Sequence, residues 1–402
     1  MEKKNTKKKT WMKKRHAVVF ALLRKPIEIY TKLLYHITVD KFKEQGDRPY
    51  LILMNHQTAF DQFFVCFAFK RPIYFIATED IFSLGWISKV LRWLVAPIPI
   101  KKQTTDINAV MNCIKIAREG GTICLAPEGN RTYCGRTVYI NPAIAGMAKK
   151  LKMPIALFRI EGGYGVQPRW TDKLRKGKMR GYVSRVIEPE EYAAMTKEEL
   201  CRQIEDGLWV DESCVDGEFH NDVLAEYLER CIYVCPDCGL AEFESHGDII
   251  TCKSCGLKVR YLPTRELEGV GKPFPFRFVG DWYDYQNDYL NSLDLREKTS
   301  EPLFCDHANV SEVILYQKKN LLKTNADIDL YGDRIEIDGE VLHFDKVHAV
   351  TVLGRNKANI YHENGIWQLK GDKRFNALKY VNFFHRYKNI IKGDEHGKFL
   401  GL

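Results

Sequence analysis

A histidine and an aspartate, His56 and Asp61, lie where a predicted buried strand gives way to a helix. On one continuous helix their side chains would point about 140° apart, but a strand–loop–helix turn can fold the aspartate back onto the imidazole. A carboxylate on one ring nitrogen fixes the tautomer and leaves the other nitrogen to take a proton from an alcohol. The pattern therefore indicates general-base chemistry, although a lone histidine in such a motif is more often bonded to a loop carbonyl.

Two further strand ends carry polar groups that suit a phosphate. Residues 125–132 read Leu-Ala-Pro-Glu-Gly-Asn-Arg-Thr, in which Gly129 permits close backbone approach and Arg131 offers a bidentate fork. Another apolar run ends in Lys101 and Lys102. Ligands bind at the carboxyl ends of the strands in an open α/β sheet. The three strand ends therefore predict a pocket that holds a phosphorylated alcohol beside a proton acceptor.

These motifs together resemble those of the glycerolipid acyltransferases, specifically the lysophosphatidate (1-acyl-glycerol-3-phosphate) acyltransferases. Residues 55–61 correspond to the catalytic His-x-x-x-x-Asp block of that family. Residues 127–132 correspond to its Pro-Glu-Gly-Thr-Arg-Ser block, and residues 153–157 to its last block, which is apolar and contains a proline. The order and spacing agree, and the resemblance extends over residues 12–200.

The resemblance implies transfer of a fatty acyl group from a thioester, either acyl-CoA or an acyl-carrier protein, to the free hydroxyl of lysophosphatidate. It implies that His56 is the general base, that Asp61 is its partner, and that no catalytic cofactor takes part. The implied substrate-binding residues are Asn55, Lys101, Lys102, Glu128, Gly129 and Arg131. The family usually has an arginine where this chain has Lys101 or Lys102, which leaves the exact acceptor open.

Two alternatives share the same motifs. The chemistry can act on another acceptor, either a lysophospholipid or glycerol 3-phosphate. A non-catalytic adaptor that binds lipid can also retain the pocket. The intact set of His56, Asp61, Glu128 and Arg131 favours the enzyme.

Four of the twelve cysteines form two Cys-x-x-Cys-Gly knuckles, Cys235 with Cys238 and Cys252 with Cys255. Two such knuckles can complete a tetrahedron of thiolates around one ion, and a site closed by four thiolates favours a structural role over a catalytic one. The pattern resembles a zinc ribbon or a rubredoxin-like pair and predicts structural zinc, with iron as the alternative. Balanced charge around the knuckles argues against a nucleic-acid partner.

Hydrophobic periodicity predicts the elements that position these groups. Apolar runs alternate with helical stretches as far as residue 200, which is typical of an α/β fold. The C-terminal region has short alternating strands and a closing helix, an α+β arrangement that resembles pleckstrin-homology-like domains. The predicted units are basic amphipathic helices that meet at Pro26 (1–48), an α/β acyltransferase domain (49–200), a helical connector (201–231), a zinc ribbon (232–262), a linker with a short helix (263–305) and the pleckstrin-homology-like module (306–402).

The net charge of +9 lies entirely in residues 1–25, which contain ten basic residues and one acidic residue. The composition, 45% hydrophobic and 28% charged, excludes a largely disordered or polytopic membrane protein. The apolar run at residues 17–23 is too short to cross about 30 Å of hydrocarbon, and no signal-peptide cleavage site flanks it. The basic helices, together with the tryptophan-bearing segment 81–95, predict peripheral or monotopic attachment to the cytoplasmic face of an anionic membrane.

Overall fold

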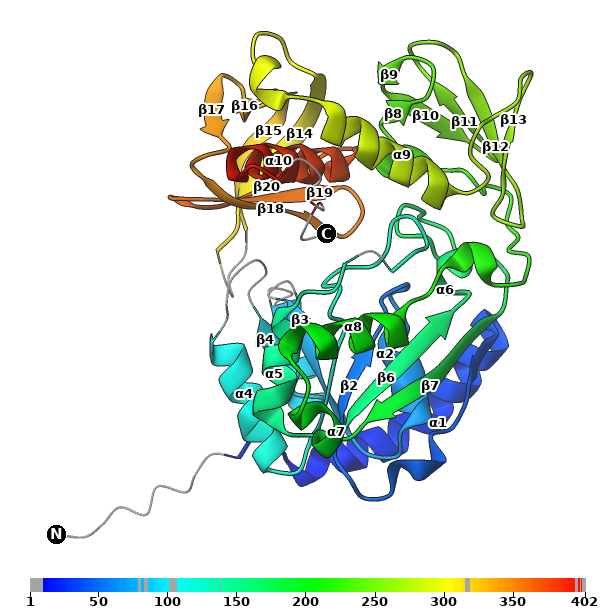
Figure 1. Cartoon of the computed structure of the whole chain (residues 1–402), viewed down its shortest axis with the longest axis vertical. Helices are drawn as coiled ribbons and strands as arrows, with labels where there is room; N and C mark the ends of the chain where they lie inside the picture. The colour runs from blue at the N-terminus through cyan, green and yellow to red at the C-terminus, as the bar shows by residue number, and fades with distance from the viewer. Residues whose placement is uncertain are drawn as a thin grey trace, which may run out of the picture.

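A computed structural model of the chain describes residues 10–78, 81–82, 86–100, 107–137, 139–314, 319–394, 397 and 399. The chain folds into an α/β half and a C-terminal half, which lie one above the other in Figure 1.

A seven-stranded sheet forms the centre of the α/β half, and its middle strand, β2 (Leu51–Met54), is buried along its whole length. The strand order is β1-β7-β6-β2-β5-β3-β4, and neighbouring strands run parallel except for β6 and β7. The other strands are β1 (Ile37–Val39), β3 (Ile73–Thr78), β4 (Ile98–Ile100), β5 (Thr122–Leu125), β6 (Ile155–Glu161) and β7 (Met179–Ile187). Burial on both faces explains why the central strands read as continuous apolar runs.

Helices cover both faces of this sheet (Figure 1). On one face α1 and α2 pack around Phe64 and Phe67, and on the other α4, α5 and α8 pack around Ile116, Ala148 and Ile204. The helices of this half are α1 (Lys14–Tyr35), α2 (Asp61–Ala68), α3 (Trp86–Leu94), α4 (Ile107–Arg118), α5 (Ala143–Leu151), α6 (Gly163–Val166), α7 (Pro189–Ala193) and α8 (Lys197–Leu208). The predicted α/β architecture is thus confirmed.

The predicted pair of N-terminal helices is instead one helix, α1, which continues through Pro26. Proline removes one backbone hydrogen bond from a helix, but packing on both sides of it holds the helix together here. Arg24 donates to the carbonyl of Phe67 at 2.6 Å, and Ile27 packs into the core around α2. The chain then forms β1 and pairs with β7, so residues 37–39 belong to the sheet and not to an N-terminal helical unit.

The predicted helical connector is helical only as far as Leu208, where α8 ends. Beyond it the backbone pairs with the α/β half, as where the Glu212 N–H donates to the carbonyl of Gly135 at 2.9 Å. Such hydrogen bonds satisfy the backbone without a helix. Within the described residues, 3₁₀ turns include η1 (Lys43–Gln45), η3 (Glu212–Cys214), η4 (Leu228–Arg230) and η5 (Leu295–Glu297).

The C-terminal half contains a cysteine-bearing ribbon and a strand-rich module. The ribbon has the hairpin β8–β9 and an antiparallel sheet in the order β10-β11-β12-β13. Its strands are β8 (Val234–Cys235), β9 (Gly239–Leu240), β10 (Phe243–His246), β11 (Ile249–Cys252), β12 (Lys258–Tyr261) and β13 (Leu267–Gly269). The helix α9 (Val279–Ser292) connects the ribbon to the module (Figure 1).

The strand-rich module is an antiparallel sheet in the order β17-β16-β15-β14-β20-β19-β18, against which α10 (Ala377–Lys392) packs. Its strands are β14 (Phe304–Glu312), β15 (Asn320–Leu330), β16 (Arg334–Ile337), β17 (Glu340–His343), β18 (Val347–Leu353), β19 (Lys357–His362) and β20 (Gly365–Lys370). The predicted strand-rich region is confirmed, whereas its pleckstrin-homology-like identity stays a prediction.

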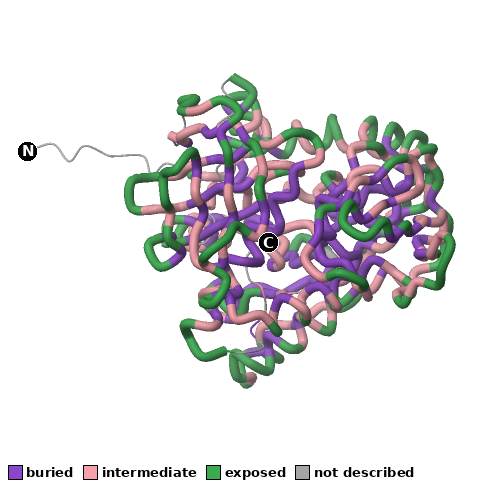
Figure 2. Tube along the Cα trace, turned by 90° about the horizontal axis from the view of Figure 1, so that it is seen from above, coloured by how far each residue is buried: buried purple, intermediate pink, exposed green. Residues whose placement is uncertain are grey.

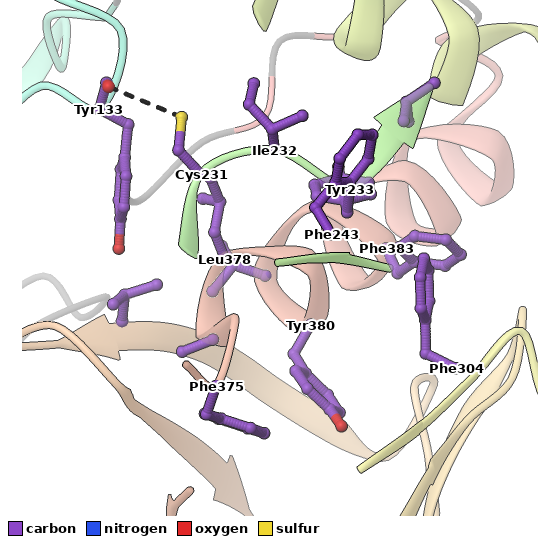
Figure 3. Packing of buried hydrophobic residues seen from close by; sticks show 14 of the residues in the cluster. Tyr133, Cys231, Ile232, Tyr233, Phe243, Phe304, Phe375, Leu378, Tyr380 and Phe383 are labelled. Atoms are coloured by element: carbon purple, nitrogen blue, oxygen red, sulfur yellow. Dashed lines mark hydrogen bonds between the residues drawn. The ribbon is translucent and has the colours of Figure 1, made fainter. Parts of the chain in front are cut away.

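One hydrophobic cluster joins the two halves (Figure 3). Tyr133 and Trp170 enter it from the α/β half, and Cys231, Phe243 and Phe383 enter it from the C-terminal half. The thiol of Cys231 donates to the backbone carbonyl of Tyr133 at 3.6 Å, the dashed line in Figure 3. Figure 2 shows buried chain gathered in the interior and exposed chain around it. The shared core fixes the C-terminal half against the loop that follows β5.

Candidate active site

His56 follows β2 at the carboxyl end of the sheet, and Asp61 is the first residue of α2. His56 Nδ1 lies 2.6 Å from Asp61 Oδ2. Because a carboxylate only accepts hydrogen bonds, Nδ1 carries the proton and Nε2 is the basic nitrogen. Asp61 has no exposed surface, whereas 28% of the His56 side chain is exposed. The structure thus brings the two predicted residues together, with the imidazole open to a substrate.

The Asp61 carboxylate also fixes the loop between β2 and α2. Its Oδ2 accepts from the Gln57 N–H at 2.8 Å, and its Oδ1 accepts from the N–H and the hydroxyl of Thr58 at 2.9 and 2.7 Å. The Thr58 hydroxyl oxygen in turn accepts from the Phe60 N–H at 2.9 Å. A carboxylate is favoured at a helix N-terminus, and four donors offset the cost of burying it. The histidine is therefore presented by a loop with little freedom.

Two side-chain contacts tie this loop to β6 and to the loop that follows β5. Asn55 donates to the carbonyl of Ile160 at 2.9 Å and accepts from its N–H at 2.7 Å, and only 1% of Asn55 is exposed. Both ends of the Asn55 amide thus join β2 to β6, and binding of substrate by Asn55 stays a prediction. Glu128 Oε1 accepts from the His56 N–H at 2.8 Å, and the Thr132 N–H donates to the His56 carbonyl at 2.9 Å.

Arg131 lies on the loop after β5, two residues beyond Gly129, whose φ of 73° favours glycine. Its guanidinium donates to Gln167 Oε1 at 3.2 Å, and the same oxygen accepts from the Ala59 N–H at 2.9 Å. Gln167 therefore connects the predicted phosphate-binding arginine to the His56 loop. Burial, and then the charge of Arg169, lowers the pKa of Arg131 to about 10, which leaves it cationic at neutral pH.

Lys101 and Lys102, the other predicted phosphate-binding residues, lie outside the described residues. Sequence reasoning missed Gln167 and Arg169, which follow β6 and contact the Arg131 loop. No motif marks these two residues. The available signal was topological, since β6 ends at the same edge of the sheet as β2 and β5.

The four predicted metal ligands lie together at one end of the ribbon. The Sγ atoms of Cys235, Cys238, Cys252 and Cys255 are all within 4.8 Å of one another. The Cys235–Cys255 and Cys238–Cys252 pairs are each 3.6 Å apart. Four thiols at this spacing suit tetrahedral coordination with Zn–S bonds of about 2.3 Å. The cluster therefore fits a metal ion held without an open coordination position.

The helices α1 and α3 both expose several large apolar side chains. The buried residue of α3 is Ser88, whose hydroxyl donates to the carbonyl of Ile81 at 2.6 Å, whereas Trp86 is 73% exposed. The helices lie side by side, since Arg15 donates to the carbonyl of Trp93 at 2.9 Å. The exposed apolar side chains are Val18, Leu22, Leu23, Ile29, Tyr30, Leu33 and Leu34 of α1 and Trp86, Ile87, Val90 and Trp93 of α3. Among the described residues, no helix is long and apolar enough to cross a membrane.

Residues 36–160 match the family model described as Acyltransferase. The matched segment contains the His56–Asp61 pair and the Arg131 loop. The resemblance to glycerolipid acyltransferases that the motifs predicted is therefore confirmed over this part of the chain.

Two known proteins resemble the same region. The 1-acyl-sn-glycerol-3-phosphate acyltransferase BAT2, chloroplastic, of Brassica napus is 21% identical over 146 residues, which is 35% of this chain and 42% of that protein. The chain thus matches less than half the length of this relative. The crystal structure of the 1-acyl-sn-glycerophosphate (LPA) acyltransferase PlsC from Thermotoga maritima is similar with a TM-score of 0.41 and 21% identity, covering 49% of this chain and 80% of that one.

Replacing Asp61 with asparagine is expected to lower the free energy of unfolding by about 3 kcal/mol, because an amide cannot accept all four buried hydrogen bonds. Urea unfolding measures this. Asp40→Asn is the matched control, since Asp40 is exposed and pairs with Arg180 at 2.6 Å, and its loss should cost less than about 1 kcal/mol. Equal effects of the two substitutions would contradict the role given to Asp61.

Replacing Cys238 with serine is expected to abolish stoichiometric metal binding and to lower the thermal unfolding midpoint, because metal binding to such a cluster contributes directly to folding. Elemental analysis of the purified protein and a thermal melt measure the two effects. Cys305→Ser provides the control, since Cys305 is an exposed cysteine outside the cluster. Unchanged metal content in Cys238→Ser would exclude the cluster as the metal site.

Proposed function

We propose that this protein is a 1-acyl-glycerol-3-phosphate acyltransferase that makes phosphatidate for phospholipid synthesis. It transfers a fatty acyl group from acyl-CoA or acyl-carrier protein to the free hydroxyl of lysophosphatidate. The observation that carries the proposal is the 2.6 Å contact between His56 Nδ1 and Asp61 on a loop bonded to the Arg131 loop. A general base beside a cation suits an acceptor that has both a hydroxyl and a phosphate.

In the proposed reaction, His56 Nε2 accepts the proton of the acceptor hydroxyl while its oxygen attacks the thioester carbonyl. Asp61 accepts the Nδ1–H and stabilises the imidazolium that forms. A carbon–oxygen bond forms, and the tetrahedral intermediate then collapses with cleavage of the carbon–sulfur bond. The departing thiolate takes the proton back from His56, so the ester and a free thiol leave and the enzyme returns to its starting state.

The acceptor's phosphate is proposed to bind Arg131, with Gly129 allowing its close approach and with Lys101 and Lys102 contributing charge. A lysophospholipid or glycerol 3-phosphate remains the alternative acceptor for the same chemistry. The Glu128 contact with the His56 backbone suits a residue that holds the two motifs in register.

The exposed apolar side chains of α1 and α3 support peripheral or monotopic attachment to a membrane, and we propose its cytoplasmic face. Isolated apolar side chains are ordinary on a protein surface, but two adjacent helices that expose them together indicate contact with lipid. The basic residues of the N-terminal segment add attraction to anionic phospholipid. The acceptor, itself a lipid, is then available where the enzyme lies.

We also propose that the cysteine cluster holds zinc as a structural ion. Four thiolates arranged in a closed tetrahedron suit Zn²⁺, and the cluster belongs to the ribbon and not to the strand ends that carry His56. Zinc, and not iron, is the metal expected in the elemental analysis described above.

Free-thiol release from an acyl thioester, with and without lysophosphatidate, tests the proposed reaction. Wild-type protein should release thiol only when the acceptor is present, and His56→Ala should lower the rate by at least about 1,000-fold because the general base is removed. His246→Ala is the matched control, since His246 is exposed and lies on the ribbon.

The other outcomes of this assay separate the alternatives. Release without any acceptor, or release that survives His56→Ala, would indicate a hydrolase or a misassigned base. Release with a lysophospholipid or glycerol 3-phosphate, but not with lysophosphatidate, would assign the alternative acceptor. Absence of release with every acceptor, from protein that still binds lipid, would favour the non-catalytic adaptor.

Membrane attachment is tested by substituting Leu33 and Trp86, each 73% exposed, with aspartate. The double variant should bind vesicles that contain anionic phospholipid at least about tenfold more weakly, because two apolar side chains no longer enter the lipid. Vesicle flotation measures this. Deletion of residues 1–45 is a poorer test because it removes β1 from the sheet. Trp209→Asp, at an exposed tryptophan outside both helices, is the control, and equal loss in the two proteins would contradict the assignment.

A further inference from the structure

Two arginines lie together beside the His56 loop. Arg169 Nη1 donates to the backbone carbonyl of Arg131 at 3.1 Å, and only 3% of Arg169 is exposed. The other hydrogen bonds of Arg169 are to Asn130 Oδ1 at 3.3 Å and the Val352 carbonyl at 3.4 Å. Its guanidinium also lies 4.5 Å from the centre of the Tyr133 ring. Each of these partners is neutral.

Neither arginine is paired with an acidic side chain in the part of the chain that the structure describes. Arg131 donates to the neutral Gln167, and the nearby carboxylate of Asp61 is already bonded by four donors. Buried cations in proteins are normally paired, because an unpaired charge loses its hydration without compensation. Among the described residues, the two guanidinium groups therefore have no carboxylate as a hydrogen-bond partner.

Two other buried arginines of this chain have such a partner. Arg230 pairs with Asp172 at 2.7 Å, and Arg265 pairs with Glu212 at 3.0 Å. Arg175 has no carboxylate, but its guanidinium lies within 5.0 Å of two aromatic ring centres and donates to three oxygen atoms. Arg131 and Arg169 are distinguished because they are adjacent like charges close to the candidate general base.

A third arginine comes from the strand-rich module. Arg355 lies in the turn between β18 and β19, the hairpin whose Val352 carbonyl accepts from Arg169. Its guanidinium lies 3.0 Å from Asp172, and that carboxylate is shared with Arg230. Burial, the charge of Arg169 and, to a smaller extent, the charge of Arg355 all lower the pKa of Arg131. Arg355 thus adds positive charge from a third segment of the chain, on a hairpin that contacts Arg169.

We propose that Arg169 and Arg355 complete, with Arg131, a binding site for the phosphate monoester of the acceptor. The strand-rich module is then part of the acceptor site. This inference rests on the proposed acyl transfer and adds specificity to it. A phosphate monoester carries close to two negative charges and several acceptor oxygens, which suit forked guanidinium donors. A phosphocholine headgroup would bring its own cation toward three arginines and is disfavoured.

Steady-state kinetics of the full chain with lysophosphatidate, lysophosphatidylcholine and monoacylglycerol test the proposal. Arg169→Gln and Arg355→Gln should each lower kcat/KM for lysophosphatidate about 10- to 100-fold, mainly through KM, because a charge-assisted hydrogen bond to phosphate is lost. The preference for lysophosphatidate over the two other acceptors should fall by a similar factor. Arg296→Gln is the control, since the exposed Arg296 pairs with Asp294 two residues away.

A structural role for the arginines predicts a different result, in which the unfolding midpoint and the KM for the acyl donor change together with the acceptor KM. The same would follow if these arginines bound the phosphates of acyl-CoA. Either result, or an unchanged acceptor preference in folded variants, would overturn the inference while leaving the proposed acyl transfer intact. Because Arg169 is buried, Arg355→Gln keeps the test decisive if Arg169→Gln fails to fold.

Direct binding separates failure of this inference from failure of the proposed function. If the wild type acylates no glycerol phosphate acceptor, the proposed function fails. Protection from thermal unfolding by inorganic phosphate or glycerol 3-phosphate, at constant ionic strength, then decides the anion site on its own. Protection that is lost in Arg355→Gln and retained in Arg296→Gln would support the site, and absence of protection of the wild type by the free phosphates and by lysophosphatidate alike would overturn it. Protection by lysophosphatidate but not by the free phosphates would assign the site to a lipid headgroup.

Discussion

The buried carboxylate of Asp61 is the constraint on which the geometry of the site depends. It accepts hydrogen bonds from the His56 ring, from two backbone amides and from the Thr58 hydroxyl, all within one short loop. Burying a carboxylate costs free energy, and this cost is offset only when all of these donors are in place. The tautomer of the histidine, the path of the loop and the start of α2 are therefore set by the same group.

The loop that carries Arg131 takes its position from this arrangement and from the C-terminal half at the same time. On one side Glu128 and Thr132 bond to the backbone of His56. On the other, Tyr133 enters the hydrophobic cluster that contains Cys231 and most of the core of the strand-rich module (Figure 3). A close-packed core transmits displacement and does not absorb it. The C-terminal half therefore bears on the position of Arg131, although it supplies neither residue of the His–Asp pair.

The sequence predicted the parts of the structure that local spacing encodes. His56 and Asp61 are five residues apart, and each pair of cysteine ligands lies within one turn, so short motifs were sufficient. The contact of Asn55 with Ile160 could not be predicted, because Asn55 follows β2 and Ile160 lies on β6, 105 positions away. Proline disfavours a helix interior, so the sequence predicted a break between two helices at Pro26. Packing of α1 against α2 and β1 overrides this local preference. Arg169 and Arg355 belong to no motif, and only the fold brings their charges together.

The cysteine ribbon has too few residues to bury a core of its own, and this explains why its apolar side chains share a core with the rest of the molecule. Its apolar side chains, among them Phe243 and Val259, belong to the same cluster as Trp282 of α9 and Tyr133 of the Arg131 loop. The buried pair of Arg265 and Glu212 adds a second connection, since Glu212 also accepts from the N–H of Gly162 at the end of β6. Binding of a metal by the four thiolates would therefore stabilise the folded state of this shared core, which extends to the Arg131 loop. The ribbon thus stabilises the Arg131 loop through residues that lie outside the acyltransferase motifs.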